Sequence, residues 1–190
     1  MFAVYKYLFP AMWMACAVYW LLMAGGNKTA TRREPLASRL LHFVPLALAV
    51  ALLWRPIPLP PVLTQRFLPR AAWVFWAGAL LALVGFLFCA WARARIGGNW
   101  SAAVTVKAGH ELVTTGPYAL VRHPIYLGLL LAFLGTALAR SDLGGVAALV
   151  LVYFAFWRKM RLEERWMREH FGPAYDAYAR RVPPLLPWPR

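Results

Sequence analysis

Long runs of hydrophobic residues without a charged side chain dominate the pattern of this chain. Residues 7–27 and 71–92 are each long enough to cross a hydrocarbon core of about 30 Å as a helix that rises about 1.5 Å per residue. The run at 40–54 is shorter and gains length if residues 36–38 join it, with Arg39 extending its charged end towards the membrane surface. These runs predict three membrane-spanning helices in the first half of the chain.

Two further hydrophobic runs, at 124–139 and 143–157, are short and lie only three residues apart. We therefore expect the two helices to form a tight hairpin, and the second to continue as an amphipathic helix over 158–171. Small residues recur at helical spacing along the first of these runs, which allows membrane helices to approach closely. These small residues are Gly128, Ala132, Gly135 and Ala139.

The composition excludes a soluble globular domain. Of the 190 residues, 62% are hydrophobic and 15% are charged, whereas soluble domains are about 45–50% apolar and about 25% charged. We expect an all-α integral membrane protein with about five transmembrane helices, a polar cytoplasmic loop at 93–123 and a C-terminal amphipathic helix. We treat residues 1–190 as a single membrane-embedded domain, in which 1–92 supply the first three spans and 93–190 the functional half.

The charged residues predict how these spans are oriented. Lys and Arg number 21 against 7 Asp and Glu, and cytoplasmic loops carry the excess of basic residues in multi-pass membrane proteins. With the C-terminus inside, 16 basic residues face the cytoplasm and five face outside, so we expect an external N-terminus. No basic run has the pattern of a nucleic-acid module, so we expect membrane lipids and no nucleic acid as partners. The five outer residues are Lys6, Arg55, Arg66, Arg70 and Arg140.

The cysteines and histidines do not predict a metal centre. Both cysteines lie inside hydrophobic runs, and the histidines are scattered without the spacing of metal ligands. We therefore expect neither a bound metal nor a structural disulfide. The residues concerned are Cys16, Cys89, His42, His110, His123 and His170.

The polar loop at 93–123 ends in a candidate site for an anionic group. Pro124 favours the first turn of a helix, which places Arg122 and His123 at the helix N-terminus, where free N–H groups and a partial positive charge attract anions. The alternative is that these two side chains merely lie at the level of the lipid headgroups.

Two adjacent acids form a second candidate feature, in the amphipathic helix at 158–171. Glu164 falls on the apolar stripe of this helix and Glu163 flanks it, and a carboxylate in such a position needs a cationic partner. The alternative is a solvated helix with pairs such as Lys159 with Glu163. Folding of the hairpin would bring the two acids beside Arg122 and His123. The combined site would then suit an amino-acid-like group, which carries both an amine and a carboxylate.

These segments resemble the isoprenylcysteine carboxyl methyltransferase family. The resemblance rests on GNWS at 98–101, GHELV at 109–113, GPY at 116–118 and RHPIYLG at 122–128, and it continues through the acids and HFGPAYDAY at 170–178. It covers residues 96–187 in order, about half of the chain. It implies an integral membrane methyltransferase that uses S-adenosylmethionine, bound at the cytoplasmic face.

The resemblance also assigns roles to individual residues. The cofactor-binding positions are His110, Glu111, Leu112, Val113, Tyr118, His123, Pro124, Ile125, Tyr126 and Glu163, and we add Arg122 because it adjoins the helix N-terminus. An arginine that the family associates with the acceptor carboxylate is replaced here by Lys159, so Arg158 or Arg161 is an alternative. If the acceptor is an amine, a base is needed, and Glu164 and His123 are the candidates.

The acceptor implied by the resemblance is the α-carboxylate of a prenylated cysteine or another lipophilic group. A carboxylate is already ionised at pH 7 and needs no general base. Methyl transfer to a phospholipid amine or a thiol is an alternative, as family resemblance does not select the acceptor. A nicotinamide-dependent enzyme similar to membrane sterol reductases and a non-enzymatic membrane scaffold are further alternatives.

Overall fold

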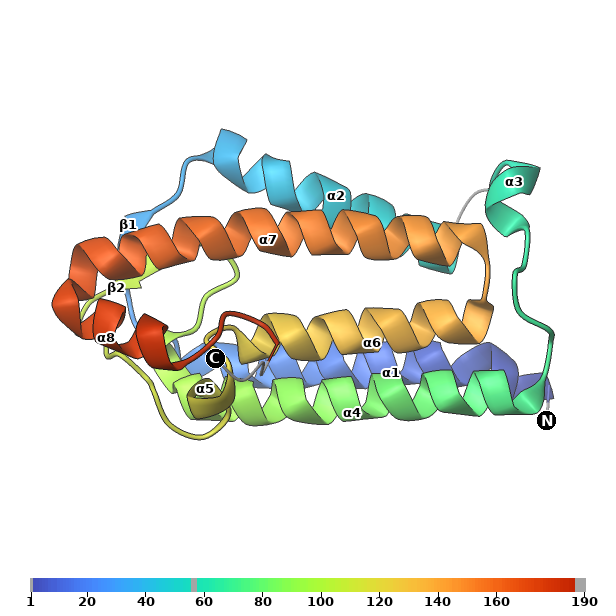
Figure 1. Cartoon of the computed structure of the whole chain (residues 1–190), viewed down its shortest axis with the longest axis horizontal. Coiled ribbons are helices and arrows are strands. Elements are labelled where there is room, and N and C mark those ends of the chain that lie inside the picture. Colours follow the sequence, from blue (N-terminus) through green and yellow to red (C-terminus); the bar gives the residue numbers. More distant parts are fainter. Residues whose placement is uncertain (1, 56–57, 187–190) are drawn as a thin grey trace.

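Five long helices run lengthwise through an elongated bundle in the computed structural model of this chain, which describes residues 2–55 and 58–186 (Figure 1). These are α1 (Phe2–Leu22), α2 (Leu36–Trp54), α4 (Ala72–Ile96), α6 (Pro124–Arg140) and α7 (Leu143–Phe171). Short elements lie between them: η1 (Met23–Gly26), α3 (Pro61–Thr64), η2 (Gly97–Asn99) and α5 (Pro117–Leu120). A further short helix, α8 (Pro173–Arg181), follows α7.

The all-helical prediction is confirmed, with one small addition. Strands β1 (Ala30–Arg33) and β2 (Thr105–Lys107) pair antiparallel as a two-stranded ribbon. The ribbon is extended at one end by the backbone N–H of Glu34, which donates to the carbonyl of Val104 at 3.2 Å. It fastens the α1–α2 connection to the segment that follows α4.

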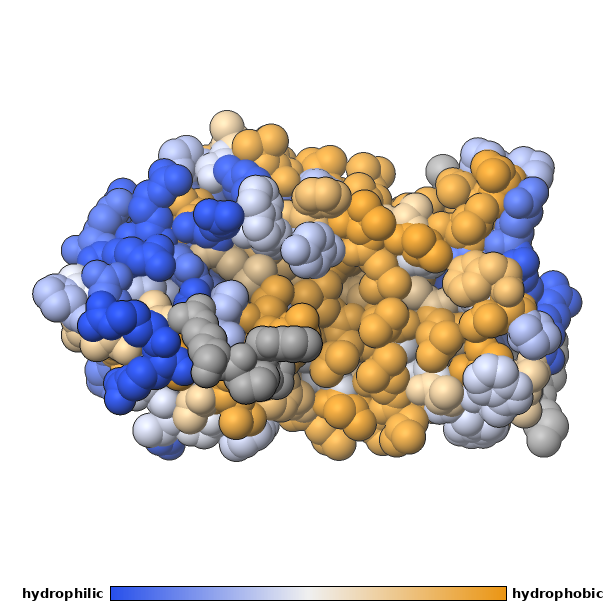
Figure 2. Space-filling model, in the orientation of Figure 1, coloured by the Kyte–Doolittle hydropathy of each residue, from blue (hydrophilic) through white to orange (hydrophobic). Residues whose placement is uncertain are grey.

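Four of the long helices are long and apolar enough to cross a membrane. They are Lys6–Gly26, Leu36–Trp54, Ala72–Asn99 and Leu143–Phe171. Helix α6 is as apolar but has only 17 residues, so five complete spans remain a prediction. Apolar side chains cover the middle of the bundle, and hydrophilic residues gather at the end that holds α8 and the β1–β2 ribbon (Figure 2). The protein therefore has the surface of an all-α integral membrane protein.

The long C-terminal helix continues past the apolar part without a break, as predicted. Helix α7 runs for 29 residues and stops at Gly172, whose φ of +53° suits glycine. Pro173 then begins α8. Two residues, Ser141 and Asp142, connect α6 to α7, and the Asp142 side chain caps α7 by accepting a hydrogen bond from the Gly145 N–H at 2.9 Å.

The small face of α6 packs against α4, and not against α7 as the hairpin prediction implied. A Cβ atom added at Gly128 would lie 2.6 Å from the Gly85 carbonyl oxygen, and one at Gly135 would lie 2.4 Å from that of Gly78. Helix α7 packs most extensively on α2, and it approaches α6 closely near the turn, where Gly145 meets Ala137. A tight hairpin along its whole length therefore stays a prediction.

The contact between α4 and α6 predicts a strong effect of one substitution. In Gly85→Leu the new Cβ would meet backbone of α6 that cannot move aside alone, so the free energy of unfolding should fall by about 1–3 kcal/mol. The apparent Tm in detergent measures this loss. Gly25→Ala, whose new Cβ meets no atom within 4 Å, serves as the control. An unchanged Tm for Gly85→Leu would contradict the packing of α4 on α6.

Candidate functional site

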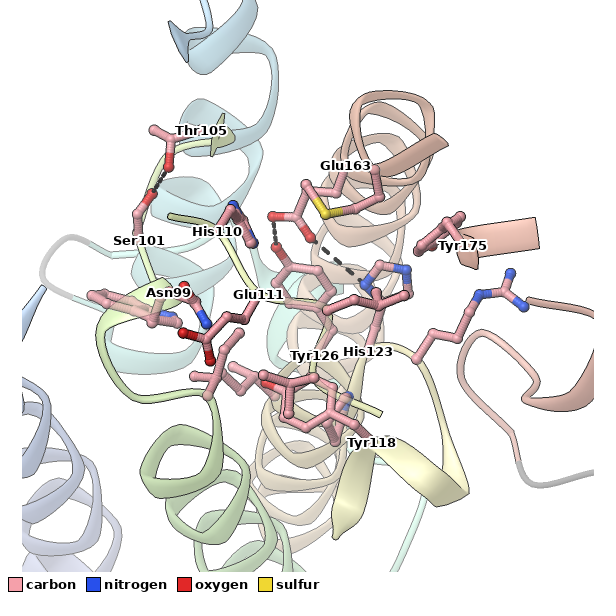
Figure 3. A pocket seen from close by; sticks show the side chains of 18 of the residues that line it. Asn99, Ser101, Thr105, His110, Glu111, Tyr118, His123, Tyr126, Glu163 and Tyr175 are labelled. Carbon is pink, nitrogen blue, oxygen red and sulfur yellow. Dashed lines mark hydrogen bonds and ion pairs between the residues drawn. The ribbon is translucent and has the colours of Figure 1, made fainter. Parts of the chain in front are cut away.

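A cavity lies at the hydrophilic end of the bundle, where the α4–α5 loop, the start of α6, the end of α7 and α8 meet (Figure 3). The segments that the sequence singled out converge on it. All eleven predicted cofactor-binding residues line its wall: His110, Glu111, Leu112, Val113, Tyr118, Arg122, His123, Pro124, Ile125, Tyr126 and Glu163.

The carboxylate of Glu163 lies in this wall, where two side chains at the start of α6 hold it. The Tyr126 hydroxyl donates to Oε1, and Nδ1 of His123 is 3.6 Å from Oε2 (Figure 3). The side chain of Glu163 keeps 24% of its surface exposed, whereas that of His123 keeps 8%. Glu163 is therefore oriented by its partners while its carboxylate still faces the cavity.

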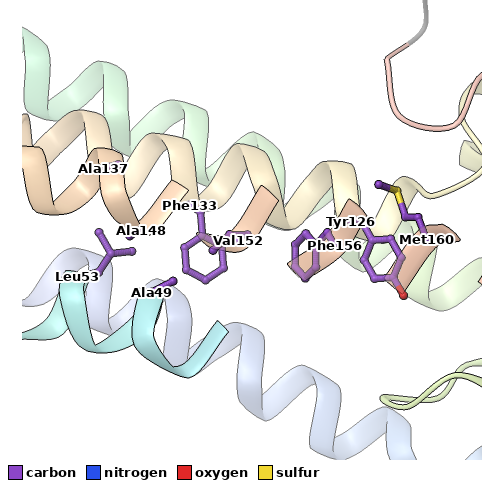
Figure 4. Close-up of a cluster of buried hydrophobic side chains, with 9 residues drawn as sticks. All are labelled: Ala49, Leu53, Tyr126, Phe133, Ala137, Ala148, Val152, Phe156 and Met160. Carbon is purple, nitrogen blue, oxygen red and sulfur yellow. The ribbon is translucent and has the colours of Figure 1, made fainter. Parts of the chain in front are cut away.

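The ring of Tyr126 is fixed from both sides. It stacks on His123 with a centroid distance of 5.5 Å and on Phe156 of α7 at 5.0 Å. Tyr126 and Phe156 belong to a buried cluster shared by α2, α6 and α7, which also contains Val152 and Met160 (Figure 4). The hydrogen bond to Glu163 thus comes from a hydroxyl whose ring is held in the hydrophobic core.

His123 bridges the two acids of α7. Its Nε2 is 3.2 Å from Oε1 of Glu164, and its other ring nitrogen faces Glu163. Burial alone lowers the pKa of His123, but the hydrogen bonds and charges of the two carboxylates outweigh burial and raise the pKa above its ordinary value. The two carboxylates therefore favour the protonated form of the imidazole, which links α6 to α7.

Arg122 meets the acids as the sequence predicted, but it is not free to bind an anion. Its Nε donates to Glu164 at 2.9 Å, and Nη1 donates to the carbonyls of Ala179 and Val182 at 2.9 and 2.6 Å. The backbone N–H groups of Arg122 and His123 donate to the carbonyls of Pro183 and Pro184 at 2.9 and 3.0 Å. The segment after α8 therefore occupies donors that the sequence left open for a ligand.

None of the four predicted catalytic residues lines the cavity. Lys159 is buried, donates to the Ala102 carbonyl at 2.6 Å and lies over the Tyr126 ring. Arg158 donates to the carbonyl and hydroxyl of Ser38, each at 3.0 Å. Arg161 is exposed over the ring of Trp157, and Glu164 pairs with Arg122.

Several residues that line the cavity carried no predicted role. The resemblance had quoted 98–101 and 170–178 as matching segments, which was the available signal, but it gave these residues no function. Ile96, Ala103, Thr105 and Met167 lie outside these segments and had no such signal. These residues are Ile96, Asn99, Trp100, Ser101, Ala103, Thr105, Met167, Tyr175 and Tyr178.

The raised pKa of His123 predicts a pH dependence of stability. A group whose pKa is higher in the folded state stabilises the protein fully below its unfolded pKa, about 6.5, and loses this contribution as the pH rises through the folded value. The difference in apparent Tm between the wild type and His123→Gln should therefore be largest near pH 6 and shrink towards pH 9.

The control for this measurement is His170→Gln, which removes an exposed histidine near the end of the same helix as the two acids. Its Tm difference from the wild type should not change in this way. A His123→Gln difference that grows with pH would show that the imidazole is neutral between the carboxylates.

Comparisons with known proteins find relatives of this chain, and a family model matches the part of the chain that contains most of the site residues. The family model described as PEMT, phospholipid methyltransferase, matches residues 73–174, more than half of the chain. Protein-S-isoprenylcysteine O-methyltransferase B of Arabidopsis thaliana is 36% identical over 80 residues, which cover 42% of this chain and 41% of that protein. The cobalt-zinc-cadmium resistance protein CzcN of Cupriavidus metallidurans is 34% identical over 114 residues, 59% of this chain and 51% of that protein.

A third relative matches more of the chain. Methanethiol S-methyltransferase 2 of Bradyrhizobium diazoefficiens is 33% identical over 167 residues, 80% of this chain and 61% of that protein. The chain spans about half the length of the curated relatives it matches. The match to the family model runs from the start of α4 into α8 and includes the start of α6 and both acids. On this evidence the chain belongs to the phospholipid methyltransferase family.

Proposed function

We propose that this protein transfers a methyl group from S-adenosylmethionine to a lipophilic acceptor, and that the cavity at the start of α6 binds the methyl donor. The observation that carries the proposal is that eleven residues chosen from separate sequence segments line one cavity. The membership of the chain in a methyltransferase family supports this proposal.

The chemistry of the cavity wall fits this donor. When bound, S-adenosylmethionine supplies a methyl group on a positively charged sulfur, together with an ammonium and an adenine. Glu163 offers a carboxylate for a cationic group, and its orientation is fixed by Tyr126 and His123. The rings of Trp100 and Tyr118 provide apolar surface for a flat base or a cation.

The chain's own contribution to the reaction would be binding, orientation and exclusion of water. Positioning two reactants in line accounts for much of the acceleration of such a displacement. The lining combines rings and apolar side chains with few charged groups, which keeps water from the reacting atoms. A base is unnecessary if the acceptor is a carboxylate, since that group is ionised at pH 7.

We propose the α-carboxylate of a prenylated cysteine as the acceptor. Of the three basic candidates for its recognition, Lys159 contacts a side chain that lines the cavity, through the ring of Tyr126. Arg158 is engaged with Ser38, and Arg161 lies over Trp157. A thiol acceptor is the second candidate, because the methanethiol S-methyltransferase relative aligns with 80% of this chain.

We also propose that the cavity faces the cytoplasm and that the N-terminus lies outside. The distribution of basic residues along the sequence supports this orientation, because 16 fall in the segments assigned to the inner side and five in those assigned to the outer side. A polar donor would then enter from the cytoplasm, while the lipid chain of the acceptor would approach through the bilayer.

The donor site is tested by removing one charge from the cavity wall. Glu163→Gln should weaken binding of S-adenosylhomocysteine, measured by calorimetric titration in detergent, by about tenfold or more, because a hydrogen bond to a charged group is worth about 1.5–3 kcal/mol. Glu169→Gln, which changes an exposed acid of the same helix, is the matched control. Affinities within a factor of two for both variants would refute the assignment of the cavity.

The acceptor is tested with a labelled methyl group on the donor. We expect transfer to a prenylated cysteine, and the product should release volatile label in mild alkali because a methyl ester hydrolyses to methanol. N-methyl and S-methyl products resist this treatment. Transfer to phosphatidylethanolamine or a small thiol, with alkali-stable label and none on prenylcysteine, would overturn the carboxylate proposal and retain the methyltransferase.

A further inference from the structure

A second cavity lies at the opposite end of the bundle, where the N-terminal part of α1 meets the end of α2, the start of α4 and the α6–α7 turn. Its volume is about 650 Å³, compared with about 140 Å³ for the candidate active-site cavity. Nothing in the proposed methyl transfer uses this space.

Basic side chains from four separate parts of the chain converge on this cavity. They are the five residues that the sequence analysis placed outside: Lys6, Arg55, Arg66, Arg70 and Arg140. Among the described residues that line it, Asp142 is the single acid. Five positive charges and one negative charge leave the lining with an excess of four positive charges.

The one carboxylate is already shared between two arginines. Arg55 donates to Oδ2 of Asp142, and Nε of Arg140 is 3.4 Å from the same oxygen. Within the part of the chain that the structure describes, the Nε atoms of Arg55 and Arg140 are buried and make no hydrogen bond. No carboxylate of the described residues pairs with Lys6, Arg66 or Arg70. The buried Nε of Arg55 without an acceptor is costly, and an anion in the cavity would satisfy it. The same anion would neutralise the exposed charges of Lys6, Arg66 and Arg70.

The rest of the lining is apolar. Phe9, Leu53 and Phe75 are buried in the wall, and Trp54 flanks it. A cationic rim above an apolar wall, at the end of membrane-spanning helices, matches a ligand with a charged head and a hydrocarbon body. Guanidinium groups pair with phosphate oxygens in a bidentate geometry, which favours a phosphate over a carboxylate headgroup.

We propose that this cavity binds the phosphate group of an anionic phospholipid. The headgroup phosphate lies among the arginines, and the glycerol and upper acyl chains lie against the apolar wall. Because the cavity is bounded by α1, α2, α4 and the α6–α7 turn, a bound lipid would hold these elements together at the membrane surface away from the candidate active site.

The test uses the whole chain in detergent, with two probes and two double variants. Titration with phosphatidylglycerol should raise the apparent Tm of the wild type, and phosphatidylcholine, whose headgroup has no net charge, should raise it less. Arg66→Gln with Arg70→Gln removes two charges without breaking the Asp142 pairs, and it should weaken the apparent affinity for phosphatidylglycerol about tenfold. Arg165→Gln with Arg181→Gln removes the same charge at the other end of the bundle and should leave the affinity unchanged.

Inorganic phosphate distinguishes the two sources of the anion. An equal rise in Tm with phosphate alone, lost in the Arg66/Arg70 double variant, would assign the cavity to a free phosphate and overturn the lipid proposal. Equal weakening in both double variants would show a general charge effect and would also overturn it. Because the readout is lipid binding, these results do not depend on methyl transfer.

Discussion

The charge cluster at the start of α6 is the interaction on which the functional end of the molecule depends. A buried histidine lies between two carboxylates of α7, and the neighbouring Arg122 pairs with one of these acids and with carbonyls after α8. Removal of one partner would leave a buried charge without compensation, which is costly in a low-dielectric environment. Three segments that are distant in sequence are therefore held in one arrangement, and the cavity is the space that they enclose.

Both this cluster and the hydrophobic core determine the position of the Glu163 side chain. The core fixes the ring of Tyr126 against Phe156, and the ring directs a hydroxyl at the carboxylate. His123 then restrains the other carboxylate oxygen. A side chain held by two partners loses little further conformational entropy on binding a ligand, which is the physical meaning of a preorganised site.

Much of the fold followed from hydrophobic runs and helix-breaking residues. Pro124 begins α6 and the α7 helix continues to Gly172, because these features depend on local backbone preferences. The meeting of Arg122 with Glu164 was also predictable, since a two-residue turn brings the far ends of two helices to the same side. The helix that packs against the small face of α6 could not be predicted, because glycines allow a close approach but do not determine which helix approaches. The hydrogen bonds from the backbone N–H groups of Arg122 and His123 to the carbonyls of Pro183 and Pro184 could not be predicted either, because they depend on tertiary structure.

If α6 crosses the bilayer as the sequence predicts, its short length has a consequence for the surrounding lipid. Its 17 residues rise about 26 Å, less than the hydrocarbon thickness of about 30 Å, whereas α4 and α7 have 25 and 29 residues. This hydrophobic mismatch is relieved if the bilayer thins beside α6 or if the polar start of the helix lies below the headgroups. In either case the reacting group of a lipid-anchored molecule would travel less far out of the membrane to reach His123 and Glu163. The thickness of the bilayer would then affect how easily a lipid-anchored molecule reaches the cavity.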